Sequence, residues 1–346
     1  MRTTGEVPLA REFKWGVIPK LISMDVCQDE RTRGCVLVVA MLASFLPPFM
    51  ASSINIALPA IGDEFSIDAV LLGWIATSYL LSSAVLMVPF GKYADIYGMK
   101  RIFILGLAVF TISSLLAAEA PSSLFLIASR VVQGIGAAMI FGTSTAILVR
   151  AYPIAERGRV LGINAASVYL GLSLGPFLGG LLTQYLGWRS LFLVSVPLGL
   201  VPLALAAFML RDELAGEGED ELDLLGSLIY SIMLISVMYG FSRLPSALGA
   251  ALVLGGFIVL LLLIRWESRV KSPVLDISLF RGNRVYAFSN LAALINYSAT
   301  FSVTFLLSLY LQYIKGLQPD EAGLILVAQP LVMTLLSPYT CLLYTS

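Results

Sequence analysis

Long apolar runs alternate with short polar segments along nearly all of the 346 residues. An α-helix needs about 20 consecutive apolar residues to cross the hydrocarbon core of a membrane, and many of the runs approach or exceed that length. The pattern predicts ten membrane-spanning helices, over residues 35–57, 70–90, 102–119, 122–149, 160–182, 190–210, 224–242, 246–264, 285–313 and 322–340. We therefore expect an all-α, polytopic helical bundle that lies in a lipid bilayer.

The polar breaks divide the chain into five parts. Residues 1–34 form a charged tail without an apolar core, so they are not a signal peptide; a misassigned start codon is the alternative. Six spans follow in 35–210, and an acidic, solvated linker at 211–223 separates them from a tight two-span hairpin at 224–264. The last part, 265–346, opens with a short amphipathic stretch and then holds the last two spans.

Composition agrees with a membrane protein and excludes several other classes. Charged residues make up only 13% of the chain and hydrophobic residues 58%, whereas a soluble protein carries about 25% charged residues. The formal net charge of zero argues against a nucleic-acid partner. The chain has no histidine and three scattered cysteines, so we expect no metal site, no disulfide framework and no cofactor.

The distribution of lysine and arginine predicts the orientation of the chain. When the spans are threaded in order, eighteen of the 22 basic residues lie on the side of the N-terminus. The opposite side holds only Arg189, Arg243 and Lys315, and Arg130 lies inside a span. Because basic residues concentrate on the cytoplasmic side, we expect a multi-pass protein of the cell membrane with its N-terminus in the cytoplasm.

A glycine-rich stretch, 162–180, lies in the fifth predicted span. Its marked positions are Gly162, Gly171, Gly175, Pro176, Gly179 and Gly180. Three of the glycines recur every four residues, so they line one stripe of a helix where another backbone can approach closely. A proline within the span removes an intrahelical hydrogen bond and bends the helix. The stretch predicts a close helix–helix contact in the membrane.

A short polar segment, 91–101, joins the second and third spans. Its marked positions are Gly91, Asp95, Gly98, Lys100 and Arg101. The glycines permit a tight turn, and Asp95 is expected near the start of the third span, where helix N-terminal amides or a neighbouring cation can hold it. The alternative is an ordinary basic loop that happens to contain an acid, which the joint spacing of the five residues disfavours.

Arg130 lies among apolar residues of the fourth span. An arginine in the middle of a membrane helix costs about 3 kcal/mol or more, so it is a candidate functional residue. The alternative is that its side chain reaches a membrane surface. Gln133, Gly134 and Gly136 follow at spacings that suit close packing against a neighbouring helix.

These segments together resemble the major facilitator superfamily, and in particular its fourteen-span drug:proton antiporters. The segment 91–101 is similar to the signature loop between the second and third helices, 126–138 to the fourth-helix motif, and 162–180 to the antiporter motif of the fifth helix. The stretch 52–61 resembles the first-helix motif of the antiporters. The resemblance covers nearly the whole chain from about residue 35 and implies a C-terminally truncated transporter of that fold.

The resemblance also assigns roles and shows departures. It implies that Asp95 holds a gate, that Arg130 tunes the acceptor of the coupling proton, and that the glycine stripe lets two transporter halves close against each other. Ile96 and Met99 stand where the family usually has basic residues, so the gate is expected to be weaker or to use Arg101. Met50 replaces a common acid, and Ser195 replaces a common asparagine.

The acceptor of a coupling proton is not evident in the sequence, because no acid lies well within a predicted span. The candidates are Glu119 at the outer end of the third span, Asp95, or a residue of a part that the chain lacks. Glu119 is also explained as a solvated acid at the edge of a loop.

The resemblance implies a secondary active transporter, not an enzyme, that exports small amphipathic molecules by proton antiport with alternating access. We expect it to act as a monomer. Candidate pore residues are few and comprise Asn55, Gln133, Asn164, Tyr169, Asn296 and Tyr297. The alternatives are a facilitator-type importer or exporter of sugars, organic acids or other metabolites, and a sensor that transports nothing. A membrane-embedded enzyme would need clustered catalytic acids or metal ligands in the spans, and the sequence shows none.

Overall fold

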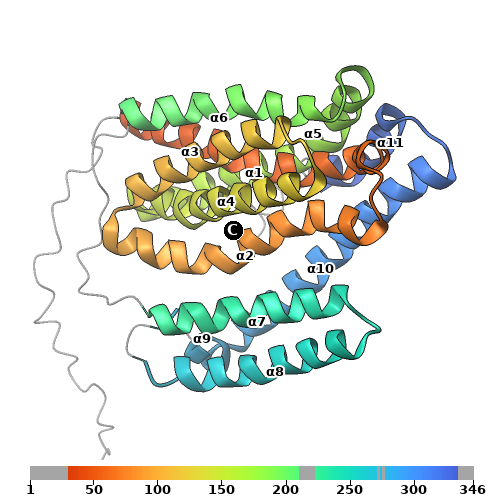
Figure 1. Cartoon of the computed structure of the whole chain (residues 1–346). Coiled ribbons are helices and arrows are strands. Elements are labelled where there is room, and N and C mark those ends of the chain that lie inside the picture. Colours follow the sequence, from red (N-terminus) through yellow and green to blue (C-terminus); the bar gives the residue numbers. More distant parts are fainter. Residues whose placement is uncertain (1–29, 210–222, 271–272, 275–276, 334–346) are drawn as a thin grey trace, which may run out of the picture.

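The computed structural model of the protein describes residues 30–209, 223–270, 273–274 and 277–333 (Figure 1). Most of the predicted tail and of the acidic linker lies outside these residues. Within the described part the chain forms helices and no strands, which confirms the all-α class.

Nine helices of the described part are long and apolar enough to cross a membrane. The first six are α1 (Glu30–Phe65), α2 (Ala69–Tyr97), α3 (Met99–Ala118), α4 (Ser123–Ala151), α5 (Ile154–Leu186) and α6 (Arg189–Met209). The others are α7 (Leu224–Ser242), α8 (Ala247–Glu267) and α10 (Arg284–Leu309), which a π-helical turn, η1 (Tyr310–Ile314), extends. The short helices are α9 (Ile277–Gly282) and α11 (Pro319–Leu326). α11 begins the tenth predicted span, and residues 334–340 of that span lie outside the described residues.

The first helix is longer than the apolar run that predicted it. α1 has 36 residues and includes Pro47, Pro48 and Pro59. At 1.5 Å per residue it is about 54 Å long, well beyond the roughly 30 Å hydrocarbon core, so it must tilt or project from the membrane. The prolines do not end the helix, because neighbouring helices can satisfy the carbonyl groups that prolines leave without a donor.

Helices α1–α6 form one bundle in which successive helices run in opposite directions (Figure 1). α1 packs against α4, α5 and α6, while α4 packs against both α2 and α3. The helix ends therefore gather at two ends of the bundle. One holds Asp95 and Arg150, and we call it the Asp95 end; the other holds Glu64 and Arg189, and we call it the Arg189 end.

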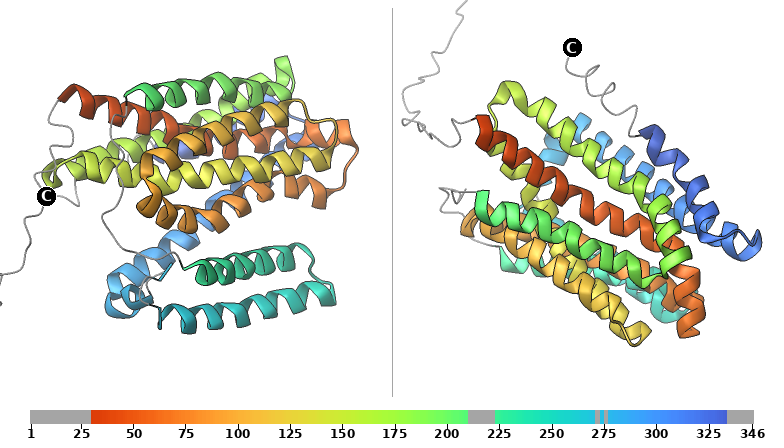
Figure 2. Two further views of the ribbon diagram at one scale, coloured as in Figure 1. Left: turned by 60° about the vertical axis from the view of Figure 1, so that its left-hand side comes forward. Right: turned by 90° about the horizontal axis from the view of Figure 1, so that it is seen from above.

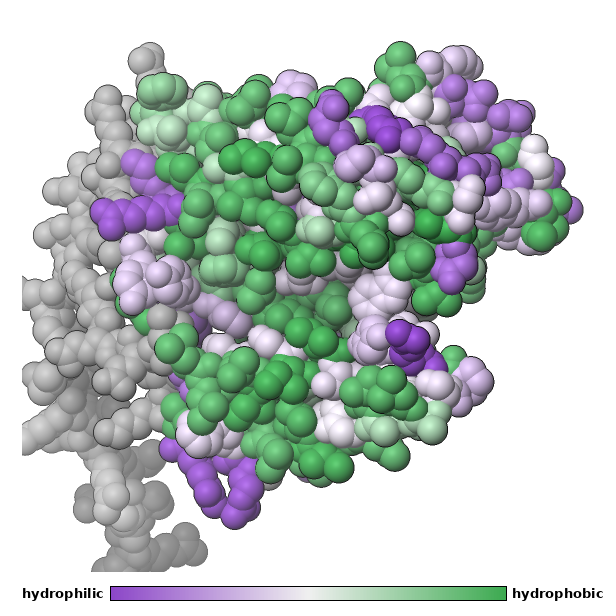
Figure 3. Space-filling view, in the orientation of Figure 1, coloured by the Kyte–Doolittle hydropathy of each residue, from purple (hydrophilic) through white to green (hydrophobic). Residues whose placement is uncertain are grey.

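The hairpin of α7 and α8 lies beside this bundle as a separate pair of helices (Figures 1 and 2). Its two helices pack on each other, and α7 alone of the two packs broadly against α2. The Tyr230 hydroxyl donates a hydrogen bond to Ala84 O at 3.3 Å, and the rings of Trp74 and Tyr239 lie 5.8 Å apart. The remaining surface of the hairpin is exposed and largely apolar (Figure 3).

Helices α10 and α11 lie against the side of the bundle that α1 and α5 form. α10 contacts α1, and α11 packs against α5, so that α5 lies between α1 and α11 (Figure 2, right). These two helices belong to the last of the five predicted parts. The six-helix bundle therefore meets the second half through α1 and α5, which contact α10 and α11.

Candidate functional site

The three evenly spaced glycines of α5 face α1. A Cβ atom at Gly171 would lie 2.5 Å from Phe45 O, and one at Gly179 would lie 2.9 Å from the Cβ of Ser53. A Cβ at Gly175 would lie 2.9 Å from the Cβ of Ser52. Since real Cβ atoms do not approach other atoms this closely, the stripe confirms the predicted close contact of two backbones.

The rest of the glycine-rich stretch divides between two partners. A Cβ at Gly180 would lie 2.9 Å from the Cα of Asp320, and one at Gly323 of α11 would lie 3.1 Å from the carbonyl carbon of Pro176. Gly162 is partly buried nearer the other end of α5. The stripe itself was expected between the two halves, but it packs within the first half, because α5 turns only its Pro176 and Gly180 side toward α11.

Arg130 is fully buried in the six-helix bundle, so it does not reach a membrane surface. Its Nε donates a hydrogen bond to Ile75 O of α2 at 3.2 Å, and its Nη1 donates to the side-chain oxygen of Gln133. The Gln133 amide in turn donates to Ser114 Oγ of α3 at 2.7 Å. Arg130 and Gln133 therefore connect α4 to both α2 and α3.

An aromatic ring covers the Arg130 guanidinium. Its central carbon lies 4.2 Å from the ring centre of Tyr79, and the Tyr79 hydroxyl donates to Pro47 O of α1 at 3.1 Å. Such a ring stabilises a cation by about 0.5–2 kcal/mol. Among the described residues no carboxylate pairs with Arg130, and its Nη2 has no hydrogen-bond partner. The positive charge of Arg130 is therefore stabilised by the carbonyl dipoles of Ile75 and Gln133 and by the face of the Tyr79 ring.

The two glycines after Arg130 let α4 fit tightly between its neighbours. A Cβ at Gly134 would lie 3.2 Å from the Cβ of Ser82 on α2, and one at Gly136 would lie 2.6 Å from Phe110 N on α3. Side chains here would push the helices apart. The fourth-helix segment thus fixes the position of Arg130 by close packing on both sides.

Asp95 lies in the last turn of α2, because that helix continues to Tyr97 and α3 begins only at Met99. Gly98 then turns the chain with a φ of 110°, a conformation that favours glycine. The partner of Asp95 is Arg150 at the end of α4, with an Nη2–Oδ1 distance of 3.2 Å. The gate was expected to be weaker than in the family or to use Arg101.

The other marked residues of 91–101 lie around this turn. Gly91 lies against α4, where a Cβ at Gly142 would lie 3.2 Å from Gly91 N. Lys100 is partly buried and Arg101 is exposed in the first turn of α3. The ion pair between Asp95 and Arg150 is also partly exposed, so solvent weakens it.

Two departures from the family pattern meet in the structure. The fully buried hydroxyl of Ser195 on α6 lies 2.8 Å from the sulfur of Met50 on α1 and donates to Leu191 O at 2.9 Å. Both side chains are closed off from solvent. The place of the common acid is therefore occupied by an uncharged pair that fills its space.

The remaining predicted residues do not form one cluster. Glu119 caps α3 and is exposed, whereas Asn55 and Asn164 are buried. Tyr169 of α5 and Tyr297 of α10 bring their hydroxyl oxygens to 3.4 Å across the gap between the halves. Next to Tyr297, Asn296 is exposed on α10.

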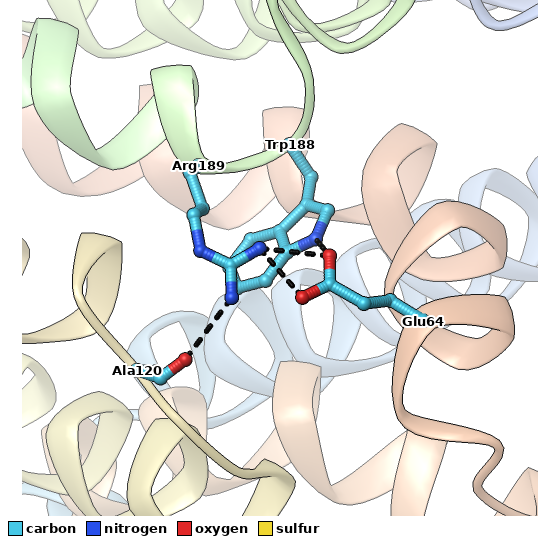
Figure 4. A network of polar contacts seen from close by, with 4 residues as sticks. All are labelled: Glu64, Ala120, Trp188 and Arg189. Carbon is cyan, nitrogen blue, oxygen red and sulfur yellow. Dashed lines mark hydrogen bonds and ion pairs between the residues drawn. The ribbon is translucent and has the colours of Figure 1, made fainter.

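A polar network at the Arg189 end was not foreseen (Figure 4). The Arg189 guanidinium pairs with the Glu64 carboxylate at 2.7 Å and donates to Ala120 O at 3.2 Å. The Trp188 indole N–H donates to the same carboxylate at 2.7 Å. The sequence placed Arg189 on the side opposite the N-terminus, but Glu64 is 125 residues away from it, and no local pattern connects the two. The network ties α1, the α3–α4 loop and the start of α6.

Comparison with known proteins decides the family. The sequence model of the Major Facilitator Superfamily matches residues 40–343. The chain belongs to this superfamily. Among solved structures, the fold is similar to a partially occluded, inward-open conformation of the xylose transporter XylE from E. coli, with a TM-score of 0.57 at 15% identity over 87% of this chain and 70% of that one.

Several relatives of this superfamily member are known by name. It is 32% identical to the riboflavin transporter RibZ of Clostridioides difficile (strain 630) over 89% of this chain and 67% of that protein. It is 36% identical to the cephamycin export protein CmcT of Amycolatopsis lactamdurans, over 87% of this chain and 64% of that protein. It is 31% identical to the multidrug resistance protein Stp of Mycobacterium tuberculosis (strain CDC 1551 / Oshkosh), over 89% of this chain and 58% of that protein. The chain thus spans about three fifths to two thirds of these relatives.

Proposed function

We propose that this superfamily member exports small amphipathic molecules by proton antiport with alternating access, as a protein of the fourteen-span type. Relatives named for multidrug resistance and antibiotic export support the cargo class. The α7–α8 hairpin between the six-helix bundle and α10 supports the fourteen-span type, since it adds two spans between the halves. The protein lies in the cell membrane with the Asp95 end in the cytoplasm.

The observation that carries this proposal is the position of α5 between the halves. α5 packs through its glycine stripe on α1 of its own half and through Gly180 on α11 of the other half. The first contact keeps α5 fixed in its bundle, while the second separates and re-forms as the halves rock. Cargo then reaches its site, near the Tyr169 and Tyr297 hydroxyls, from alternate ends.

Arg130 supplies the positive charge of the coupling machinery. It projects from α4, donates to Ile75 O of α2 and is linked to α3 through Gln133. It also lies against Tyr79, whose hydroxyl bonds Pro47 O of α1. We propose that its field lowers the proton affinity of an acidic side chain in one of the two conformations, so that the proton leaves on one side only. Asp95 and Glu119 are the acids that the sequence offers for this step.

A second candidate function is uncoupled transport of a metabolite. It is favoured by the Met50–Ser195 pair, which puts no carboxylate at the position where related antiporters often carry one. The riboflavin transporter among the relatives also fits it. In this case flux would follow the gradient of the cargo and would not respond to a pH gradient.

One experiment separates the two functions. The full-length gene is expressed, and inverted membrane vesicles are incubated with a panel of lipophilic cations and with riboflavin, with and without an imposed pH gradient. Proton antiport predicts gradient-dependent uptake of at least one compound, and Arg130→Ala abolishes it while membrane insertion is retained. Uptake that is the same with and without the gradient would reject proton antiport and favour the uncoupled transporter.

A further inference from the structure

Two backbone carbonyl groups of α1 accept hydrogen bonds from side chains of the second half. Ser308 Oγ of α10 donates to Asn55 O at 2.8 Å, and the Gln312 amide of η1 donates to Ile56 O at 3.2 Å. Gln312 Nε2 also lies 3.2 Å from Ser308 Oγ. The two side chains and the two carbonyls therefore form one connected set between α1 and α10.

The covalent structure of α1 explains why Asn55 O needs an outside donor. In an α-helix the carbonyl of residue 55 would bond the N–H of residue 59, but Pro59 has no N–H. The proline ring also pushes the carbonyl four residues earlier away from the helix axis. Pro59 thus turns Asn55 O into an acceptor that points outward and must find a donor elsewhere.

The hydrogen bonds between α1 and α10 lie in buried, apolar surroundings. Ser308 is fully buried, and an apolar cluster of Ile56, Leu311, Ala322 and Leu326 packs around the contact from α1, η1 and α11. Water is therefore excluded while the helices are together. A carbonyl without a donor in such surroundings costs free energy, whereas the same carbonyl exposed to water is satisfied.

We propose that Ser308 and Gln312 are positioning residues that hold the two halves together at the Arg189 end. In this role the hydrogen bonds form when the halves close at that end and are replaced by water when they separate. Because Pro59 has no N–H, it leaves the Asn55 carbonyl free to accept the hydrogen bond from Ser308. The inference rests on the proposed alternating access, and it assigns to Ser308, Gln312 and Pro59 a part in it that no local sequence pattern indicated.

The test measures the closing equilibrium directly and needs neither cargo nor a gradient. Spin labels are attached to Val70→Cys at the start of α2 and Lys315→Cys after η1, two exposed positions at the Arg189 end on opposite halves. Every native cysteine, including the three of this sequence, is replaced by serine. Distance distributions of the full-length protein in proteoliposomes then give the ratio of the open to the closed form.

Ser308→Ala removes the donor and should raise the open-to-closed ratio about five-fold, which corresponds to about 1 kcal/mol. Gln312→Met should shift it in the same direction. Ser308→Thr keeps a hydroxyl and should stay close to the unsubstituted protein. The matched control is Thr304→Val, one turn earlier on α10, because among the described residues the Thr304 hydroxyl bonds only Thr300 O of its own helix, at 2.9 Å.

A double-mutant cycle tests the part of Pro59. Pro59→Ala restores an N–H that can satisfy Asn55 O within α1, so Ser308→Ala should then change the ratio less than two-fold. The proposal is overturned if Ser308→Ala matches Thr304→Val, or if its effect is equally large in the Pro59→Ala background. A protein that shows these shifts but exports nothing would reject the proposed cargo and coupling and leave the positioning role in place.

Discussion

Adding a single methyl group to α5 should have different effects at Gly171 and Gly180. Both substitutions to alanine raise helix propensity by about the same amount, roughly 1 kcal/mol, so this contribution cancels in the comparison. At Gly171 the new Cβ lies 2.5 Å from Phe45 O and 3.1 Å from Phe49 N, within the first half. At Gly180 it lies 2.9 Å from the Cα of Asp320, in the second half.

The magnitude follows from the atoms that must move. In both places the close atoms belong to backbone, which cannot rotate away, and overpacking of this kind costs typically about 1–3 kcal/mol. Gly171→Ala should therefore lower the unfolding temperature, because in the proposed cycle α1 and α5 stay in contact within one half. Gly180→Ala should leave that temperature nearly unchanged and favour separation of the halves by about 5- to 150-fold.

Two measurements check this prediction on the same samples. Thermal unfolding of the purified protein in detergent reports the stability of the bundle, and the Val70–Lys315 label distance reports opening at the Arg189 end. Gly255→Ala on α8 is the control, since a Cβ there has no neighbour within 4 Å. The reasoning fails if Gly180→Ala lowers the unfolding temperature as much as Gly171→Ala and leaves the distance distribution unchanged.

Three further substitutions test the other contacts. Arg130→Ala should abolish gradient-driven transport in vesicles with normal membrane insertion, because the buried cation is lost; unimpaired transport would contradict its coupling role. Asp95→Asn should lower stability by less than about 1 kcal/mol, as its pair is partly exposed, yet slow transport; exchanging the charges of Asp95 and Arg150 should restore the rate, and no recovery would argue against a gate made by this pair. Glu64→Gln should lower stability by about 1–2 kcal/mol in chemical denaturation, since Glu64 accepts charged hydrogen bonds that include one from Arg189; an unchanged midpoint would show that solvent screens the network.

The sequence by itself determined which segments lie in the membrane. In lipid every backbone polar group must be satisfied, so a long apolar run has to be helical, and each of the nine helices of membrane-spanning length coincides with a predicted span. The sequence defined the ends of these helices less well. α1 begins at Glu30 and continues to Phe65 through charged residues, because a helix can extend beyond the hydrocarbon core where water accepts its side chains.

The sequence also marked most positions where backbones approach or charges are buried, since evenly spaced glycines let membrane helices approach closely and a buried arginine is costly. Gly171, Gly175 and Gly179 do pack against a helix, and Arg130 is buried. The pattern could not say which helix the glycines face, because a helix stripe gives a direction about its own axis and no partner.

Only the tertiary structure decided the partners. Asp95 pairs with Arg150 across 55 residues, and Asn55 O receives a hydrogen bond from Ser308 across 253 residues. Such pairs depend on how whole helices are arranged, and a serine or a carbonyl carries no local signal of its partner. Pro59 lies in the stretch 52–61, which the sequence marked only through its resemblance to a first-helix motif. That the carbonyl it leaves without a donor joins the two halves became evident only when α10 was placed beside α1.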